Sequence, residues 1–216
     1  MDYGGVLTEP VHESFARFEA ELGVRAGDSY AALRTAAQDE DGGMIGALER
    51  GEISVEAFDA HLHRLLRDAG YEVVEGTGLL DGLFAAMEPA GGLWEVVDEV
   101  RGQGVRTGLL SNSWGLSPYP VDRLERSFDT IVLSGEVGLR KPDPRIFALA
   151  LDRIGLPAES CVFVDDLADN VAAATELGLH GVHHRGDDQA TRAAVMEARG
   201  LPVPPQGNAR GSGPGG

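Results

Sequence analysis

The sequence predicts an α/β fold in which a parallel sheet is covered by helices on both faces. From residue 91 onward, short apolar runs alternate with helical patterns, as in parallel strands joined by crossover helices. Residues 12–89, in contrast, have helical periodicity and no convincing strand. We therefore expect a separate helical block beside the sheet.

The composition is that of an ordinary globular protein, with 43% hydrophobic and 25% charged residues among 216. This length allows one domain with a large insertion or two small domains. The 18 basic and 35 acidic side chains give a formal net charge of −17, which argues against nucleic-acid and anionic-membrane partners. Cys161 is the single cysteine, and the N-terminus resembles neither a signal peptide nor a membrane span, so we expect a cytoplasmic protein. The sequence does not predict the oligomeric state.

Glycines and a capping serine divide the helical block into five predicted helices. The clearest begins after Ser54, which is a good N-cap, and ends before Gly70. Its apolar residues recur along one face, which indicates that this face is buried. The five predicted helices cover residues 11–22, 29–37, 44–50, 55–69 and 79–87.

The second part of the chain alternates predicted strands with predicted helices. Asp143 is a good N-cap, and Pro144 suits the first position of the helix that follows. We expect a loop over residues 135–144 and a flexible tail rich in Pro and Gly over residues 201–216. The strands are predicted at residues 105–110, 130–133, 161–164 and 181–183, and the helices at residues 93–101, 121–126, 144–154, 168–177 and 189–199.

Polar residues follow three of the predicted strands. Ligands bind beyond the carboxyl ends of parallel strands, so these residues are expected at one edge of the sheet. Asp2 joins them if the residues before it form another strand. A turn, a solvated loop charge or a helix cap explains each cluster singly, but the whole set in one order is hard to obtain by accident. The clusters are Ser111 with Asn112, Lys141, and Asp165 with Asp166.

Lys141 is the only lysine among the 18 basic residues. Its retention suggests that a compact ammonium group with three donors is needed at this place. Chance in an arginine-biased composition explains the count equally well.

These residue types suit the transfer of a phosphoryl group to a carboxylate. Asp2 is expected to attack the phosphorus of a phosphate monoester and form an aspartyl-phosphate, which water then hydrolyses. Mg²⁺ prefers hard oxygen ligands, which Asp2, Asp166, the carbonyl of Gly4 and waters supply, while Asp165 ligates or orders a water.

The remaining polar residues suit the phosphate group of a small phosphorylated metabolite. Lys141 is expected to offset negative charge on the phosphate and on Asp2. The Ser111 hydroxyl and the amide or backbone of Asn112 donate to the phosphoryl oxygens as these gain charge in the transition state.

Four segments resemble, in order, the four motifs of the haloacid dehalogenase-like (HAD) hydrolase superfamily. They are residues 2–7, 110–112, 140–144 and 164–170, and the similarity extends to about residue 185. The sequence is most similar to subfamily IA phosphatases, among them the epoxide hydrolase N-terminal phosphatase and bacterial sugar-phosphate phosphatases. This resemblance implies a Rossmann-like core of residues 1–11 and 90–200, a helical cap of residues 12–89, a need for Mg²⁺, and Asp2 as the nucleophile.

Two positions depart from the family pattern. Gly4 stands where most of these phosphatases have a second Asp, whose general acid and base assistance is worth roughly 10² to 10⁴ in rate. We therefore expect a slow enzyme, or one limited to good leaving groups. Only Met1 precedes Asp2, where the family has a buried strand, so we expect that residues upstream of Met1 are missing.

Two other functions stay open at this stage. One is a HAD-like binding or regulatory protein with weak or no catalysis. The other is a metal-independent haloacid dehalogenase, in which the same Asp attacks carbon. The Asp165 and Asp166 pair opposes the second alternative, because unpaired carboxylates repel the carboxylate of a haloacid. The sequence does not identify the substrate.

Overall fold

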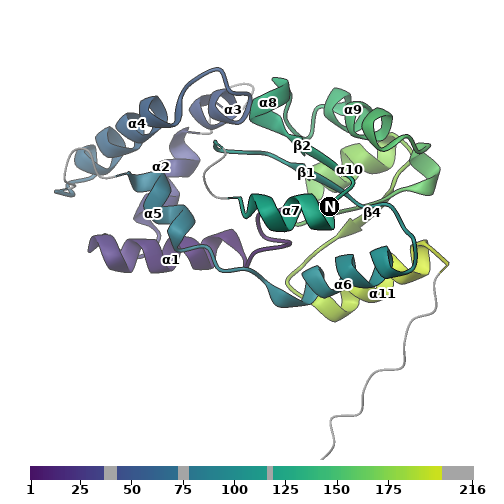
Figure 1. The fold of residues 1–216 in the computed structure, drawn as a ribbon. Helices are drawn as coiled ribbons and strands as arrows, with labels where there is room; N and C mark the ends of the chain where they lie inside the picture. The colour runs from purple at the N-terminus through teal and green to yellow at the C-terminus, as the bar shows by residue number, and fades with distance from the viewer. Residues whose placement is uncertain (37–42, 73–77, 116–118, 201–216) are drawn as a thin grey trace, which may run out of the picture.

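The computed structural model describes residues 1–36, 43–72, 78–115 and 119–200. Figure 1 shows the helices of the first part of the chain on one side, and the strands with their flanking helices on the other. Among the described residues, none of the helices combines the length and hydropathy that a membrane-spanning helix needs. The predicted tail over residues 201–216 lies outside the described residues.

Helices α1 to α5 form the helical block. They share an apolar core of their own. Phe15, Phe58 and Leu66 are among its most buried side chains. The Ser54 hydroxyl accepts a hydrogen bond from the Ala57 N–H at 3.2 Å, as the sequence predicts for an N-cap. The helices are α1 (Val11–Leu22), α2 (Asp28–Ala36), α3 (Gly43–Glu49), α4 (Val55–Asp68) and α5 (Leu79–Ala85).

The second part of the chain contains two pairs of parallel strands, β1 with β2 and β3 with β4. Helices α6 and α11 pack on one face of these strands, and α9 and α10 pack on the other (Figure 1). The strands are β1 (Gly108–Ser111), β2 (Thr130–Leu133), β3 (Val162–Asp165) and β4 (His180–His183). The helices are α6 (Gly91–Gly102), α7 (Val121–Ser127), α8 (Ser134–Val137), α9 (Pro144–Ile154), α10 (Ala168–Glu176) and α11 (Asp188–Ala198).

The first two residues of the chain join the two strand pairs. The Asp2 N–H donates to the Val164 carbonyl of β3 at 2.9 Å, and the Leu110 N–H of β1 donates to the Met1 carbonyl at 3.0 Å. The Met1 ammonium group donates to the Gly108 carbonyl at 2.9 Å. Met1 and Asp2 therefore lie between β1 and β3, and Asp2 lies at the edge where both strands end.

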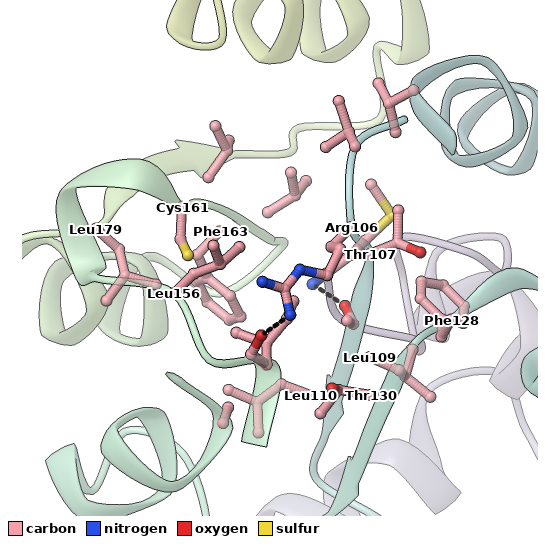
Figure 2. A pocket seen from close by; sticks show the side chains of 18 of the residues that line it. Arg106, Thr107, Leu109, Leu110, Phe128, Thr130, Leu156, Cys161, Phe163 and Leu179 are labelled. Atoms are coloured by element: carbon pink, nitrogen blue, oxygen red, sulfur yellow. Dashed lines mark hydrogen bonds between the residues drawn. The ribbon is translucent and has the colours of Figure 1, made fainter. Parts of the chain in front are cut away.

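An apolar cleft of about 150 Å³ continues from Met1 between β1 and β3. Figure 2 shows Leu109, Phe128 and Phe163 among the side chains around it. The cleft lies between the facing edges of β1 and β3. Met1 lines it, and Asp2 is not among the residues that do.

Several element bounds differ from the sequence prediction. Strand β1 begins at Gly108 because Thr107 is held outside it, its N–H donating to Asp129 at 2.8 Å and its hydroxyl to the Ser127 carbonyl at 2.7 Å. The predicted loop over residues 135–144 was wrong at its start, where α8 forms a single helical turn that ends at Gly138 with φ 68°. One turn is too short to show helical periodicity in a sequence.

Candidate active site at the carboxyl edge of the strands

The chain turns sharply directly after Asp2. The Leu7 N–H donates to the Tyr3 carbonyl at 2.8 Å, and the Gly5 N–H donates to the Thr8 hydroxyl at 3.0 Å. Gly5 has φ 71°, and a Cβ atom there would lie 2.5 Å from an Asp166 carboxylate oxygen. Glycine is therefore required at position 5, and it lets this turn pack against Asp166.

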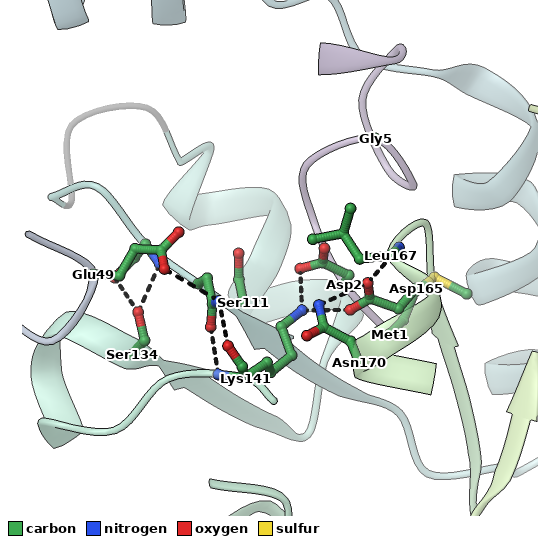
Figure 3. Close-up of polar contacts among 12 residues, drawn as sticks. Met1, Asp2, Gly5, Glu49, Ser111, Ser134, Lys141, Asp165, Leu167 and Asn170 are labelled. Carbon is green, nitrogen blue, oxygen red and sulfur yellow. Dashed lines mark hydrogen bonds and ion pairs between the residues drawn. The ribbon is translucent and has the colours of Figure 1, made fainter. Parts of the chain in front are cut away.

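Three carboxylates meet at this edge of the strands. Asp2, Asp165 and Asp166 each offer an oxygen atom, and these oxygens lie within 4.8 Å of one another. The Lys141 Nζ atom is 2.7 Å from an Asp2 oxygen and 2.6 Å from an Asp165 oxygen (Figure 3). Only 1% of the Lys141 side chain is exposed, and two of the three donors of its ammonium group are directed at these carboxylates.

Asp165 is the most constrained of the three acids. One of its oxygens accepts hydrogen bonds from the Leu167 N–H and the Asn170 amide, each at 2.9 Å, and its other oxygen pairs with Lys141. A carboxylate has about four acceptor positions, and three are occupied here. Asp165 therefore fixes the position of Lys141 and has little capacity left for a further ligand.

Burial shifts the titration of this cluster. It raises the pKa of Asp2 to about 7, an effect that the Lys141 charge opposes and the Asp165 charge reinforces. Burial and the Asp165 charge also raise the pKa of Asp166 to about 6. Burial alone lowers the pKa of Lys141, but the Asp2 and Asp165 carboxylates outweigh it, so this pKa is raised. One ammonium group balances only part of the negative charge, and hard oxygen donors of this kind fit a divalent cation such as Mg²⁺.

Ser111 is the last residue of β1, one residue later than the predicted end of the strand, and Asn112 follows it. The Asn112 side chain accepts from the Lys141 N–H at 2.8 Å and donates to the Lys141 carbonyl at 3.0 Å, so it holds the backbone that carries Lys141. The Ser111 hydroxyl lies 3.0 Å from the Tyr119 hydroxyl. The side-chain amide of Asn112 thus holds the backbone of Lys141 in place.

Glu49 at the end of α3 links the helical block to this edge. Its carboxylate accepts from Arg140 Nε at 2.6 Å and from the Trp114 indole at 2.9 Å. These three residues were not predicted as part of the site. Glu49 has no distinctive sequence signal, because it is one acid among many on an amphipathic helix.

A chamber of about 940 Å³ lies between the helical block and the carboxyl edge of the strands. Asp165 is fully buried behind Lys141 and does not line it. The structure therefore brings the remaining predicted residues to one cavity, and these are Asp2, Gly4, Ser111, Asn112, Lys141 and Asp166.

The chain matches one protein family and is similar to several known proteins. A family model described as haloacid dehalogenase-like hydrolase matches residues 1–178. Acyl-CoA dehydrogenase family member 10 of Mus musculus is 29% identical over 204 residues, which are 92% of this chain and 18% of that protein. Bifunctional epoxide hydrolase 2 of Sus scrofa is 26% identical over 207 residues, which are 89% of this chain and 37% of that protein. The chain thus spans well under half of either relative.

A third relative is a glyceraldehyde 3-phosphate phosphatase of Methanothermobacter thermautotrophicus, 29% identical over 126 residues, which are 56% of this chain and 55% of that protein. Among solved structures, a predicted HAD-like family hydrolase of Porphyromonas gingivalis aligns with a TM-score of 0.66 and 27% identity, over 91% of this chain and 95% of that one. A HAD family enzyme of Bacteroides thetaiotaomicron, solved with magnesium and inorganic phosphate, has a TM-score of 0.66 at 21% identity and covers 86% of this chain and 93% of its own. This second likeness concerns the fold.

Proposed function

Since the chain belongs to the haloacid dehalogenase-like hydrolase family, we propose that it is a Mg²⁺-dependent phosphatase that cleaves a phosphate monoester through an aspartyl-phosphate on Asp2. The observation that carries this proposal is the position of Asp2. Its carboxylate lines the chamber, 2.7 Å from a buried ammonium group and beside two further carboxylates. The similarity to a glyceraldehyde 3-phosphate phosphatase supports the same reaction class.

The proposed reaction proceeds in two displacements at phosphorus. Lys141 holds one oxygen of Asp2, which orients the carboxylate. The second oxygen attacks phosphorus, so that a bond from Asp2 to phosphorus forms while the bond to the ester oxygen breaks. Water then attacks the phosphorus, the bond to Asp2 breaks, and inorganic phosphate leaves with Asp2 restored.

The surrounding residues serve the phosphoryl group. When bound by Asp2, Asp166 and the Gly4 carbonyl, Mg²⁺ supplies positive charge to the phosphoryl oxygens. We assign the Ser111 hydroxyl and the backbone N–H of Asn112 as donors to those oxygens. The side-chain amide of Asn112 is not assigned this role, because it already holds the backbone of Lys141. We assign Asp165 to positioning Lys141 rather than to direct ligation, on account of its three existing contacts.

Gly4 offers no side chain to protonate the leaving oxygen. We therefore expect the leaving oxygen to take its proton from water, which favours esters whose alcohol is acidic. General acid assistance is worth roughly 10² to 10⁴ in rate, so p-nitrophenyl phosphate should be hydrolysed faster than a simple alkyl phosphate by at least such a factor.

The division of the chain into two parts belongs to the same proposal. We assign residues 12–89 as a cap over a core of residues 1–11 and 90–200. The separate apolar core of the helical block supports this assignment. A small phosphorylated metabolite bound in the chamber would contact both parts.

The decisive experiment measures Mg²⁺-stimulated hydrolysis of p-nitrophenyl phosphate by the whole chain and by Asp2→Asn. We expect Asp2→Asn to lose activity to background, with Asp152→Asn on the exposed face of α9 as the matched control. Wild-type activity in Asp2→Asn would remove Asp2 from the mechanism. Activity towards none of a broad set of phosphate esters would instead favour a binding protein, and chloride release from a haloacid in EDTA would favour a dehalogenase.

A further inference from the structure

The chamber is apolar where the helical block forms its wall. Of the twelve described residues that α1 to α5 and their connections contribute there, seven have hydrocarbon or thioether side chains. They are Pro10, Val11, Leu33, Ile45, Leu83, Phe84 and Met87. This wall faces the carboxyl edge of the strands, where the charged residues lie.

An aromatic surface extends this wall towards the strands. The Trp114 ring lies 6.2 Å from the Phe84 ring and 6.5 Å from the Phe58 ring, measured between centroids. Its indole N–H donates to Glu49, so the polar edge of the ring is already satisfied. Trp114 and Phe84 therefore present hydrocarbon surface to the chamber.

The polar side chains of this wall are either hydrogen-bonded within the protein or exposed to solvent. The Ser14 hydroxyl donates to Glu9 at 3.0 Å, and the Glu49 carboxylate is held by Arg140 and Trp114. His12, Tyr30 and Arg34 line the chamber too, and these three exposed side chains all lie on α1 and α2. The part of the wall formed by α3, α5 and Met87 thus offers few hydrogen-bond partners for substrate hydroxyl groups.

We infer that the substrate is a phosphate monoester whose body is apolar, such as a medium-chain alkyl or isoprenoid phosphate, rather than a sugar phosphate. This inference rests on the phosphatase function proposed above. A hydroxyl group buried against the wall loses water without gaining a partner, whereas a buried methylene gains from leaving water. The chamber, at about 940 Å³, is near the upper end of the usual range of roughly 300 to 1,000 Å³ for small-molecule sites and has room for such a body.

A series of n-alkyl phosphates from butyl to decyl tests the inference, because their leaving alkoxides are chemically alike and only the buried length changes. We expect kcat/KM to rise about threefold to fourfold per added methylene until the chamber is filled. Glycerol phosphate should bind more weakly than butyl phosphate, and competitive inhibition of p-nitrophenyl phosphate hydrolysis measures this without regard to their leaving groups. A flat series, or tighter binding of glycerol phosphate or glyceraldehyde 3-phosphate, would overturn the inference.

A matched pair of methionine variants locates the effect. Met87 lines the chamber, while Met44 packs against the core of the helical block and is not part of the chamber wall. We expect Met87→Ala to lower the ratio of kcat/KM for decyl over butyl phosphate about tenfold, and Met44→Ala to leave that ratio unchanged. Equal ratios in the two variants would place the alkyl chain elsewhere.

Two controls separate this inference from the proposed function. Hydrolysis of p-nitrophenyl phosphate without a chain-length preference would leave the phosphatase standing and remove the apolar substrate. Decylphosphonate and ethylphosphonate cannot be hydrolysed. Calorimetry therefore measures their relative affinities for Asp2→Asn without turnover. Stronger binding of decylphosphonate by a chain that hydrolyses no ester would keep the apolar site and remove the phosphatase.

Discussion

At the scale of single residues, Lys141 decides the charge balance of the site. It is fully buried, and it pairs at 2.7 and 2.6 Å with two carboxylates that are themselves buried. Without it, Asp2 and Asp165 would face each other in a medium that screens charge poorly. The sequence pointed to this residue through its rarity, its place after a predicted strand and the family-like segment 140–144, and the structure supplies the electrostatic reason for a cation here.

We predict that Lys141→Met abolishes phosphatase activity and lowers the free energy of unfolding by about 3 to 5 kcal/mol, because it leaves buried carboxylates uncompensated. Urea denaturation measures the loss. The double variant Lys141→Met with Asp165→Asn should recover part of the stability but none of the activity. Additive losses in the double variant would show that Lys141 and Asp165 are not coupled.

The raised pKa of Asp2, about 7, gives a second prediction at this scale. Between its ordinary value near 3.8 and about 7, the folded chain keeps a proton that the unfolded chain has released. Stability therefore falls as pH rises through this window. The Met1 amine, whose pKa burial lowers to about 5, acts in the opposite direction, so the effect of Asp2 has to be isolated by comparison.

Asp2→Asn provides that comparison, since it keeps the amine and removes the titrating acid. In EDTA, we expect the Tm of Asp2→Asn to rise relative to that of the wild type by several degrees between pH 4 and pH 8, given about 2 to 4 °C per kcal/mol for a chain of this size. Differential scanning fluorimetry measures both proteins at each pH. A constant difference in Tm would show that Asp2 keeps an ordinary pKa. Added Mg²⁺ should stabilise the wild type more at pH 8 than at pH 5, because its ligands must be deprotonated.

At the scale of elements, the sequence predicts what depends on local pattern and misses what depends on contacts between distant segments. The N-caps at Ser54 and Asp143 are visible in the sequence because each satisfies backbone donors of its own helix. The gathering of Asp2, Lys141 and Asp166 follows from parallel strands that end at one edge. The link from Glu49 to Arg140 joins residues far apart in the chain, and no local pattern marks it.

This link gives a prediction about how the helical block is held. Glu49 is buried and accepts from both Arg140 and Trp114, so Glu49→Gln should lower the free energy of unfolding by about 1 to 3 kcal/mol. Glu52→Gln is the matched control, because the Glu52 pair with Arg50 is exposed and should contribute about 0 to 1 kcal/mol. Urea denaturation compares the two variants. Equal losses would mean that the link between the helical block and the loop of Lys141 contributes no more than a surface ion pair.

At the scale of the whole molecule, the backbone of Met1 and Asp2 hydrogen-bonds to both strand pairs and carries the proposed nucleophile. Met1 and Asp2 hydrogen-bond to β1 on one side and to β3 on the other. Beyond Met1, the same strand edges border an apolar cleft instead of another strand. Asp2 is thus held in the sheet by backbone hydrogen bonds of Met1 and Asp2, whereas Asp165 is the last residue of β3, which pairs with β4, and Asp166 follows it directly.

This arrangement predicts that the cleft can be filled by design. Extending Met1 backwards with four apolar β-branched residues should raise Tm, because each side chain buried in the cleft contributes about 1.5 to 3 kcal/mol before the entropy of ordering the added residues. The extension also turns the buried ammonium group of Met1 into an amide, which still donates to the Gly108 carbonyl. A four-residue Gly-Ser extension makes the same amide without apolar side chains, so the difference in Tm between the two extended chains measures the cleft alone. Equal Tm values would show that the cleft between β1 and β3 does not accept a strand, and a higher kcat only in the apolar extension would show that the sheet also limits how firmly Asp2 is held.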